Sequence, residues 1–284
     1  MIVITGASGQ LGRLVIEALL KKLPSHEIVA AVRNPEKVAD LAARGIQVRQ
    51  ADYDQPDSLV TAFEGADKLL LISASEVGRR VPQHRAVINA AKTAGVGLLA
   101  YTSLLHADTS PLPLATEHRE TESLIHASGL PAVILRNGWY TENYIASVPA
   151  ALQYGALLGC AGQGRISSAA REDYAEAAAA VLTKPDQTGR IYELAGDESF
   201  TLGELAHEIS RQSGREVAYQ NLSASEFRSA LVNAGLPDAL ATLLAESDIG
   251  ASEGGLFDHG QQLSALIGRP TITLKEHVKR ALAQ

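Results

Sequence analysis

Short apolar runs alternate with amphipathic segments of helical length along the first half of the chain. The runs are rich in Val, Ile and Leu and rarely alternate between apolar and polar positions, which is typical of strands buried on both faces. This pattern predicts strands over Ile2–Thr5, Ile28–Val32, Ile46–Arg49, Leu69–Ser73, Leu98–Ser103 and Ala132–Arg136. The segments between them are predicted helices, over Gln10–Lys22, Pro35–Arg44, Pro56–Glu64, Arg80–Ala94 and Leu114–Ser128.

The repeated order of strand and helix determines the expected fold. Right-handed crossovers between parallel strands place helices on both faces of one sheet. We therefore expect an α/β protein with a doubly wound Rossmann-type parallel sheet. A TIM barrel is the alternative, but it needs eight such units, and the alternation weakens after about residue 140.

The second half of the chain has a different pattern. Capping boxes at Thr201–Glu204 and Ser223–Glu226 each predict the start of a helix. Further helices are predicted over Tyr140–Gln153, Arg171–Thr183 and Lys275–Leu282. We also predict a strand over Arg190–Leu194, an extended piece over Pro270–Leu274 and a loop over Gly250–Gly260. We expect a dinucleotide-binding domain over 1–140, with additions to its sheet from about 165–196, and a smaller C-terminal α/β lobe over 141–284 that forms the substrate cleft.

Composition narrows the class of protein. The 284 residues are 46% hydrophobic and 20% charged, as in a globular protein, and the net charge of −7 disfavours a nucleic-acid binder. Cys160 is the one cysteine, so an intrachain disulfide is impossible and a cysteine zinc site is not expected. The eight histidines are scattered, and we expect no metal. No apolar stretch reaches the roughly 20 residues of a membrane helix, and no targeting segment is evident, so we expect a cytoplasmic protein without membrane insertion.

A glycine string follows the first predicted strand and opens the first helix. It consists of Gly6, Ala7, Ser8, Gly9, Gln10, Leu11 and Gly12. Glycines allow a tight turn and a close approach of the backbone to a diphosphate, and the helix N-terminus offers free N–H groups. The spacing is G-x-x-G-x-x-G, and a simple strand-to-helix turn is the alternative. Its position favours dinucleotide binding.

The end of the second strand indicates which dinucleotide is bound. Folds that prefer NAD place a carboxylate about 20 residues past the glycines. Here Arg33 stands 21 residues after Gly12 (33 − 12), and a guanidinium can pair with a 2′-phosphate. We predict NADP(H), with a solvated surface arginine as the alternative.

The ends of other strands supply further candidates. Ser73, Ala74 and Ser75 are small enough to let a cofactor pass the end of the fourth strand. Asp52-Tyr53-Asp54 is either an adenine contact or a polar turn. Asn137, Gly138, Trp139 and Tyr140 follow the sixth strand, where they either bind a flat nicotinamide or substrate or pack into the core.

Several segments together resemble the NmrA-like branch of the atypical short-chain dehydrogenases/reductases, and most closely its type 2 NADPH:quinone oxidoreductases. They are the glycine string, Val32-Arg33-Asn34-Pro35, Tyr101-Thr102-Ser103, Arg136–Tyr140 and Tyr192–Gly196. The resemblance implies an NADPH-dependent reductase that transfers a hydride to a quinone bound between the lobes. It implies cofactor contacts at Gly6 to Gly12, Arg33, Ser73 to Ser75, Asn137, Gly138, Trp139, Tyr140, Thr141, Glu142 and Ala169. We expect a monomer or a homodimer.

One feature departs from the wider superfamily. Its usual acid–base pair is Tyr-x-x-x-Lys, which occurs nowhere in this chain; Leu114 and His118 occupy the comparable positions after Ser103. Leucine cannot donate a proton, which disfavours alcohol–ketone chemistry. A quinone accepts a hydride without that acid, so we expect the protein to contribute mainly proximity and alignment.

The substrate pocket and the catalytic group are less defined. His118 and Asn143 are candidates for the pocket, with Tyr140 and Tyr144 either beside Asn143 or in the core. His118 either assists protonation, binds the ribose or has a structural partner. The group that protonates the reduced quinone is not identified, and no flavin is expected. A non-catalytic, NADP-sensing regulatory protein of the same branch is the alternative function.

Overall fold

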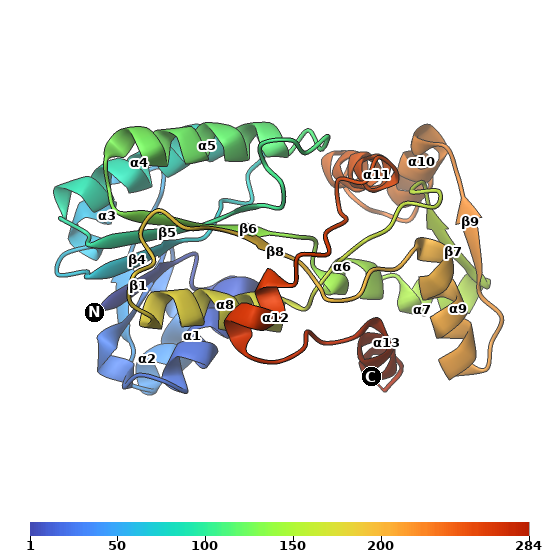
Figure 1. Ribbon diagram of the computed structural model, residues 1–284, viewed down its shortest axis with the longest axis horizontal. Helices are drawn as coiled ribbons and strands as arrows, with labels where there is room; N and C mark the ends of the chain where they lie inside the picture. Colours follow the sequence, from blue (N-terminus) through green and yellow to red (C-terminus); the bar gives the residue numbers. More distant parts are fainter. Residues whose placement is uncertain (284) are drawn as a thin grey trace.

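The structure is a computed structural model that describes residues 1–283. Its centre is a seven-stranded sheet with the order β3-β2-β1-β4-β5-β6-β8, in which all neighbours are parallel (Figure 1). The strands are β1 (Ile2–Thr5), β2 (Ile28–Val32), β3 (Gln47–Gln50), β4 (Lys68–Leu71), β5 (Leu98–Leu104), β6 (Ala132–Asn137) and β8 (Ile191–Leu194). The predicted doubly wound fold is confirmed.

Helices cover both faces of the sheet. Figure 1 shows α3 (Pro56–Ala62), α4 (Arg80–Thr93) and α5 (Ala115–Ser128) on one face. The other face carries α1 (Gln10–Leu20), α2 (Ala39–Ala43), α8 (Arg171–Thr183) and α12 (Gln262–Ile267). Successive residues of a strand point to opposite faces, so Ile4 and Leu70 join the core beside α1 and α8, whereas Val3 and Leu69 join the core beside α3 and α4.

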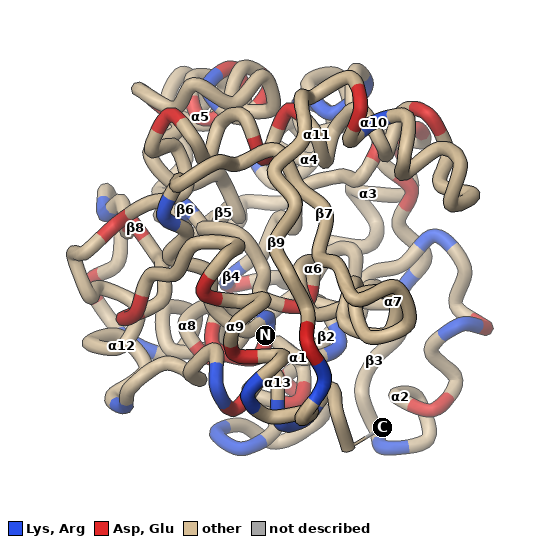
Figure 2. Tube along the Cα trace, turned by 90° about the vertical axis from the view of Figure 1, so that its right-hand side faces the viewer, with Lys and Arg blue, Asp and Glu red and all other residues tan. Residues whose placement is uncertain are grey.

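The C-terminal lobe has a small sheet of its own, and its core also includes Leu104, Leu112 and Ala115 from the first half of the chain. Strands β7 (Ala156–Gly159) and β9 (Ala218–Asn221) pair in parallel. Helices α6 (Thr141–Ile145), α7 (Val148–Tyr154), α9 (Leu202–Ser213), α10 (Ala224–Asn233), α11 (Asp238–Ser252) and α13 (Leu274–Leu282) complete the lobe. Charged residues of both signs are mixed over this end of the molecule, but β7, β9 and α7 carry none (Figure 2).

Local predictions in this half are partly right. Both capping boxes form, at Thr201–Glu204 and at Ser223–Glu226. The loop predicted over Gly250–Gly260 is wrong at its start, because α11 continues to Ser252. Gly250 therefore lies within a helix. A Cβ at this position would lie 2.8 Å from Leu112 Cγ, so a close packing contact, and not a turn, requires the glycine.

Two further differences concern where elements begin and end. The helix predicted over Tyr140–Gln153 is divided into α6 and α7, and the segment predicted over Pro35–Arg44 begins with a 3-10 turn. Strands β7 and β9 were not predicted. In the described part of the chain, no helix combines the length and the apolar character needed to cross a membrane.

Candidate cofactor and substrate sites

The glycine string forms a tight turn between β1 and α1. Gly6 has a φ of +60°, and its carbonyl accepts a hydrogen bond from Gly9 N at 2.9 Å. A Cβ on Gly12 would lie 2.5 Å from Gly6 O and 2.7 Å from Ala7 Cα, so only glycine lets α1 pack this closely on the turn. Gly9 is the N-cap of α1 and caps it without a side chain. The first N–H groups of the helix are therefore free to bind an anion.

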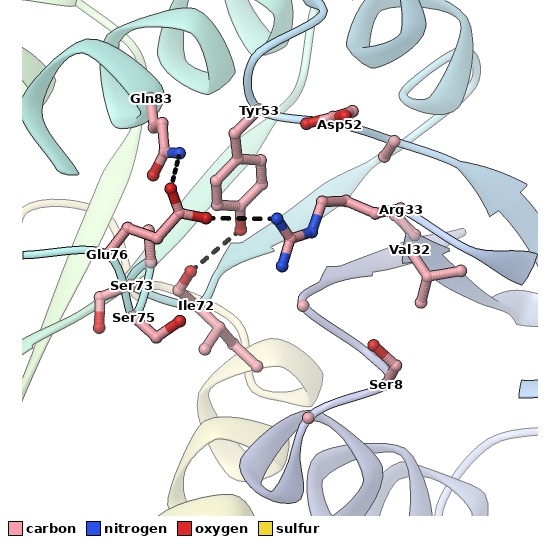
Figure 3. Close-up of a pocket in the computed structure, with 15 residues that line it drawn as sticks. Ser8, Val32, Arg33, Asp52, Tyr53, Ile72, Ser73, Ser75, Glu76 and Gln83 are labelled. Carbon is pink, nitrogen blue, oxygen red and sulfur yellow. Dashed lines mark hydrogen bonds and ion pairs between the residues drawn. The ribbon is translucent and has the colours of Figure 1, made fainter. Parts of the chain in front are cut away.

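A cavity of about 250 Å³ opens above this turn (Figure 3). Seven of the predicted cofactor residues line it: Gly6, Ser8, Gly9, Arg33, Ser73, Ala74 and Ser75. Ala7, Leu11 and Gly12 are buried beneath the turn, and Gln10 is exposed at the start of α1. The ends of β1, β2 and β4 thus form one site, as expected for the carboxyl ends of adjacent parallel strands.

Arg33 extends across this cavity toward Glu76. Its Nη1 lies 3.2 Å from Glu76 Oε1, and two thirds of its side chain is exposed (66%). Gln83 Nε2 donates to the other Glu76 oxygen at 3.3 Å. Sequence analysis missed Glu76 and Gln83, because neither belongs to a motif. The guanidinium is available to a second anion, since its partner is a single exposed carboxylate.

Tyr53 forms the inner wall of the same cavity. Its hydroxyl contacts Thr5 Oγ1 at 2.6 Å and donates to Ile72 O at 3.0 Å (Figure 3). Burial raises the pKa of the Tyr53 phenol, so the hydroxyl stays neutral. Asp52 Oδ1 accepts from Asp54 N at 3.0 Å, as in a polar turn. The segment is a polar turn that also lines the cavity, and an adenine contact there stays a prediction.

The residues after β6 form a second group. Asn137 is 5% exposed, and its Oδ1 is buried without a hydrogen-bond partner. Ala169 N donates to Trp139 O at 3.2 Å, and Thr141 N donates to Ala169 O at 2.9 Å. These bonds join the segments around residues 140 and 169, so the structure brings together two parts of the predicted site that are distant in sequence.

The flanking residues hold this group in place. Gly138 is required because a Cβ would lie 2.9 Å from the Tyr174 hydroxyl. Glu142 Oε1 accepts from Arg171 N at 3.0 Å, which caps α8 from α6. The side chain of Ala169 is fully buried, so it cannot present its methyl group to a ligand.

A second cavity, of about 440 Å³, lies where this segment enters the C-terminal lobe. Trp139, Asn143 and Tyr144 line its near side, and residues of α7, β7, α9, β9, α10 and α11 contribute to the other walls. Asn143 Oδ1 accepts from Arg171 Nη2 at 2.9 Å. The walls are mainly apolar, including Leu157, Leu202, Phe227, Leu231 and Leu244. Such a cavity suits a flat apolar molecule.

The structure places His118 elsewhere. Its ring is buried (4% exposed), and its Nδ1 lies 2.7 Å from the Tyr101 hydroxyl. Burial, with the nearby Arg80, lowers the pKa of His118 to about 3. His118 does not line the cavity that contains Asn143. The expectation that it belongs to the substrate pocket is corrected, because it occupies the buried face of α5 against β5.

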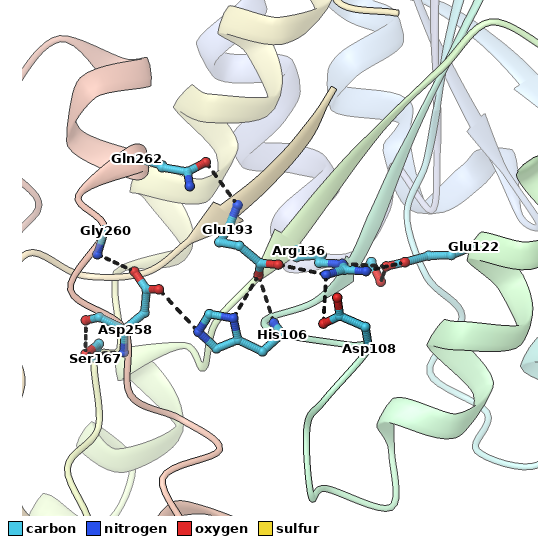
Figure 4. A network of polar contacts seen from close by, with 10 residues as sticks. His106, Asp108, Glu122, Arg136, Ser167, Glu193, Asp258, Gly260 and Gln262 are labelled. Carbon is cyan, nitrogen blue, oxygen red and sulfur yellow. Dashed lines mark hydrogen bonds and ion pairs between the residues drawn. The ribbon is translucent and has the colours of Figure 1, made fainter. Parts of the chain in front are cut away.

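Ser103, at the position of the usual catalytic serine, belongs to an ion network. Its hydroxyl donates to Glu122, which also accepts from Arg136 Nη2 at 2.8 Å. Arg136 Nη1 donates to Glu193, which lies beside His106 (Figure 4). Ser103 is thus committed to fixing β5, α5 and β6 together. Within residues 1–283, no three His, Cys, Asp or Glu side chains are grouped as metal ligands would be.

Comparison with known proteins agrees with this geometry. A family described as NAD(P)H-binding matches residues 6–185. Quinone oxidoreductase 2 of Escherichia coli (strain K12) is 60% identical over 278 residues, which cover 98% of this chain and 97% of that protein.

Two solved structures support the same relationship. The structure of an NADPH-dependent quinone oxidoreductase from Escherichia coli in complex with NADPH is 60% identical, with a TM-score of 0.98 over 99% of this chain and 100% of that chain. The Citrobacter sp. triphenylmethane reductase in complex with NADP(H) is 41% identical, with a TM-score of 0.96 over 99% of this chain and 100% of that chain.

Proposed function

The chain belongs to the NmrA-like family of NAD(P)H-binding proteins, and from that membership we propose that it is an NADPH-dependent quinone oxidoreductase. In this reaction a hydride passes from NADPH to a quinone. The observation that carries the proposal is the path of the segment 137–144, which starts at the end of β6 on the sheet and continues into the wall of the apolar cavity. One segment therefore connects the cofactor side of the sheet with the substrate side.

The residues around the glycine turn fit NADPH. The turn brings backbone close to the ligand, the start of α1 has free N–H groups for the diphosphate, and Arg33 can pair with the 2′-phosphate. The unpartnered Asn137 Oδ1 is an acceptor that a carboxamide N–H would satisfy. When bound, NADPH supplies the hydride for the reaction. We propose that these residues, with Ser73 to Ser75 and the segment Gly138–Glu142, bind and orient it.

The 440 Å³ cavity is the proposed quinone site. Trp139 and Tyr144 provide aromatic walls against which a quinone ring can stack, and the aliphatic side chains of the lobe exclude water from the ring. A triphenylmethane dye is a second candidate acceptor, because the reductase of that name is 41% identical over almost the whole chain. Both acceptors are aromatic or conjugated electrophiles that can accept a hydride.

The chain carries out this reaction without the usual acid–base pair. Ser103 is held by Glu122, and His118 is buried beside Tyr101 with a lowered pKa that keeps it neutral. Leu114 has no ionisable group. The positions that supply the acid in typical relatives therefore hold structural side chains, and the protein supplies mainly orientation and exclusion of water.

The experiment measures loss of NADPH, and separately of NADH, in the presence of benzoquinone, after subtraction of the rate without protein. We expect rapid oxidation of NADPH and much slower oxidation of NADH. Tight binding of NADPH without quinone-dependent oxidation would support the alternative, a non-catalytic NADP-sensing regulatory protein. A cytoplasmic location, a monomeric or homodimeric state, the absence of nucleic-acid binding and the division near residue 140 remain predictions.

A further inference from the structure

Among residues 1–283, two Asp residues and no Glu residue are buried, and the two differ in their partners. Asp173 is fully buried and lies 2.8 Å from Arg269, which neutralises it. Asp248, on α11, is 6% exposed. No Lys, Arg or His nitrogen within residues 1–283 lies within 4.0 Å of its oxygens. Burying a carboxylate without a cation is costly, so burial shifts Asp248 toward its neutral form.

The surroundings of Asp248 place it in the proposed quinone cavity. It lines that cavity together with Tyr144, whose hydroxyl is buried without a hydrogen-bond partner. Asp248 Oδ2 accepts from Cys160 N at 2.8 Å. The titratable groups that face it are the Cys160 thiol and the hydroxyls of Tyr144 and Tyr219, whose pKa values burial raises. All three groups are neutral at pH 7, so none of them supplies a charge that would stabilise the carboxylate.

Reduction of a quinone needs a proton as well as a hydride. The hydride brings two electrons and one hydrogen, and the product is a hydroquinone monoanion. This anion is a phenolate. A phenolate binds a proton more tightly than a carboxylate does, because the ordinary pKa of a phenol is about 10 and that of a carboxylic acid is about 4. A neutral carboxyl group beside the ring can therefore protonate it.

We propose that Asp248 is the proton donor to the reduced quinone. The O–H bond of the neutral Asp248 carboxyl breaks, a new O–H bond forms on the hydroquinone oxygen, and water from the cavity mouth returns a proton to Asp248. The Tyr144 hydroxyl, which has no hydrogen-bond partner among residues 1–283, donates a hydrogen bond to the same or the opposite oxygen. This inference rests on the proposed function and adds to it the group that completes the reaction.

The electrostatics of the site are consistent with this role. Burial raises the pKa of Asp248 to about 6, against the hydrogen bond from Cys160 N, which lowers it. A donor whose pKa lies near the working pH combines a sufficient protonated fraction with rapid proton return. A purely structural role would not need an acid, because an asparagine Oδ1 could accept the same bond from Cys160 N.

The test compares Asp248→Asn with Ser252→Ala on two acceptors. Ser252 is on the same helix but is exposed and does not line the cavity, and its hydroxyl donates to Ile249 O in its own helix. Benzoquinone needs the proton. A cationic triphenylmethyl dye does not, because hydride addition to its central carbon gives a neutral product directly. The NADPH dissociation constant and the melting temperature of each variant are measured alongside.

We expect Asp248→Asn to lower kcat with benzoquinone about 10²-fold, the lower end of what a positioned general acid contributes. The dye rate and the NADPH affinity should stay within about twofold, and Ser252→Ala should leave the rates with both acceptors unchanged. In the wild type, kcat with benzoquinone should fall as the pH rises above about 6, and the variant should lose this dependence.

Two results would overturn the inference. One is an Asp248→Asn variant with the wild-type quinone rate and pH profile. The other is an equal loss with both acceptors, which would indicate a role in positioning or stability. If the wild type reduces only quinones, the dye comparison cannot be made and the pH profile decides. A variant that keeps the wild-type dependence of kcat on pH then overturns the inference. A wild type that oxidises no NADPH with any quinone contradicts the proposed function itself, which separates the two failures.

Discussion

Arg33 and Glu76 form an ion pair of 3.2 Å across the cavity above the glycine turn, although 43 residues separate them in the chain. The pair joins the end of β2 to the loop after β4. A 2′-phosphate placed beside Arg33 would compete with Glu76 for the guanidinium. The two residues therefore affect NADPH binding in opposite directions.

Replacing Arg33 with alanine should reduce the preference for NADPH over NADH. A hydrogen bond between charged groups contributes about 1.5–3 kcal/mol, and the exposure of Arg33 favours the low end of this range. We expect the KM for NADPH to rise about tenfold, with little change in the KM for NADH. Arg79→Ala is the matched control, because Arg79 also lies near Glu76, at 3.7 Å, but does not line the cavity. An equal rise for both cofactors in Arg33→Ala would contradict the assignment.

Replacing Glu76 with glutamine should have the opposite effect. The substitution keeps the shape but removes a negative charge that competes with the phosphate for Arg33. Because exposed ion pairs are worth up to about 1 kcal/mol, the KM for NADPH should fall by about two- to fivefold. The KM for NADH should be unchanged, and both are obtained from initial rates at saturating quinone. A weaker affinity for NADPH in Glu76→Gln would show that Glu76 itself binds the cofactor.

Gly12→Ala should damage both the fold and the cofactor site. The added Cβ would meet Gly6 O at 2.5 Å, and neither the turn nor α1 can move away cheaply. Overpacking of this kind costs about 1–3 kcal/mol, seen as a lower melting temperature, and NADPH binding should be largely lost. Gly203→Ala is the control, because its Cβ would have only an ordinary contact with Thr201 at 3.6 Å. The account is wrong if Gly12→Ala binds NADPH as tightly as the wild type.

His118 and His84 should make the protein sensitive to acid. Burial, with the nearby Arg80, lowers the pKa of each imidazole in the folded state to about 3, against about 6.5 when unfolded. Between these values the unfolded chain binds more protons, so stability is complete above about pH 6.5 and falls as the pH decreases toward 3. Each histidine lowers the free energy of unfolding by up to about 1.4 kcal/mol for each pH unit of this decrease. Urea unfolding at pH 7, 6 and 5 measures the slope.

Two variants separate this effect from catalysis. His118→Gln should reduce the pH slope of stability by about half and leave the pH profile of quinone reduction between pH 5 and 9 unchanged. Tyr101→Phe removes the partner of His118 but no titrating imidazole, so the slope should persist. A change in the catalytic pH profile in His118→Gln would return His118 to the mechanism.

The sequence predicted those features that depend on neighbouring residues. Strand β2 is apolar throughout, and Arg33 follows the glycines at a fixed interval, so fold class and cofactor could be inferred directly. Strands β7 and β9 were missed because β9 is mainly polar (Ala-Tyr-Gln-Asn) and neither strand belongs to the regular alternation of strands and helices in the first half of the chain. They become strands only by pairing with each other across the lobe.

Burial and long-range contacts explain the remaining differences. The segment around His118 is rich in polar residues and looks like a solvated helix face, but α5 turns His118 toward Tyr101 in the core. Asp248 meets Cys160 across 88 residues, and nothing in either local sequence marks the contact. The chain therefore reveals its cofactor site, whereas the substrate cavity needs the structure.

The most direct test of the central claim is a single turnover under anaerobic conditions. NADPH, or NADPH deuterated at the transferred position, is mixed with excess purified protein, and one equivalent of benzoquinone is added. We predict one hydroquinone formed for each NADPH oxidised, faster than without protein, with the deuterated cofactor reacting more slowly. NADPH that stays bound and unoxidised after quinone is added would contradict direct hydride transfer and identify the protein as a cofactor-binding regulator.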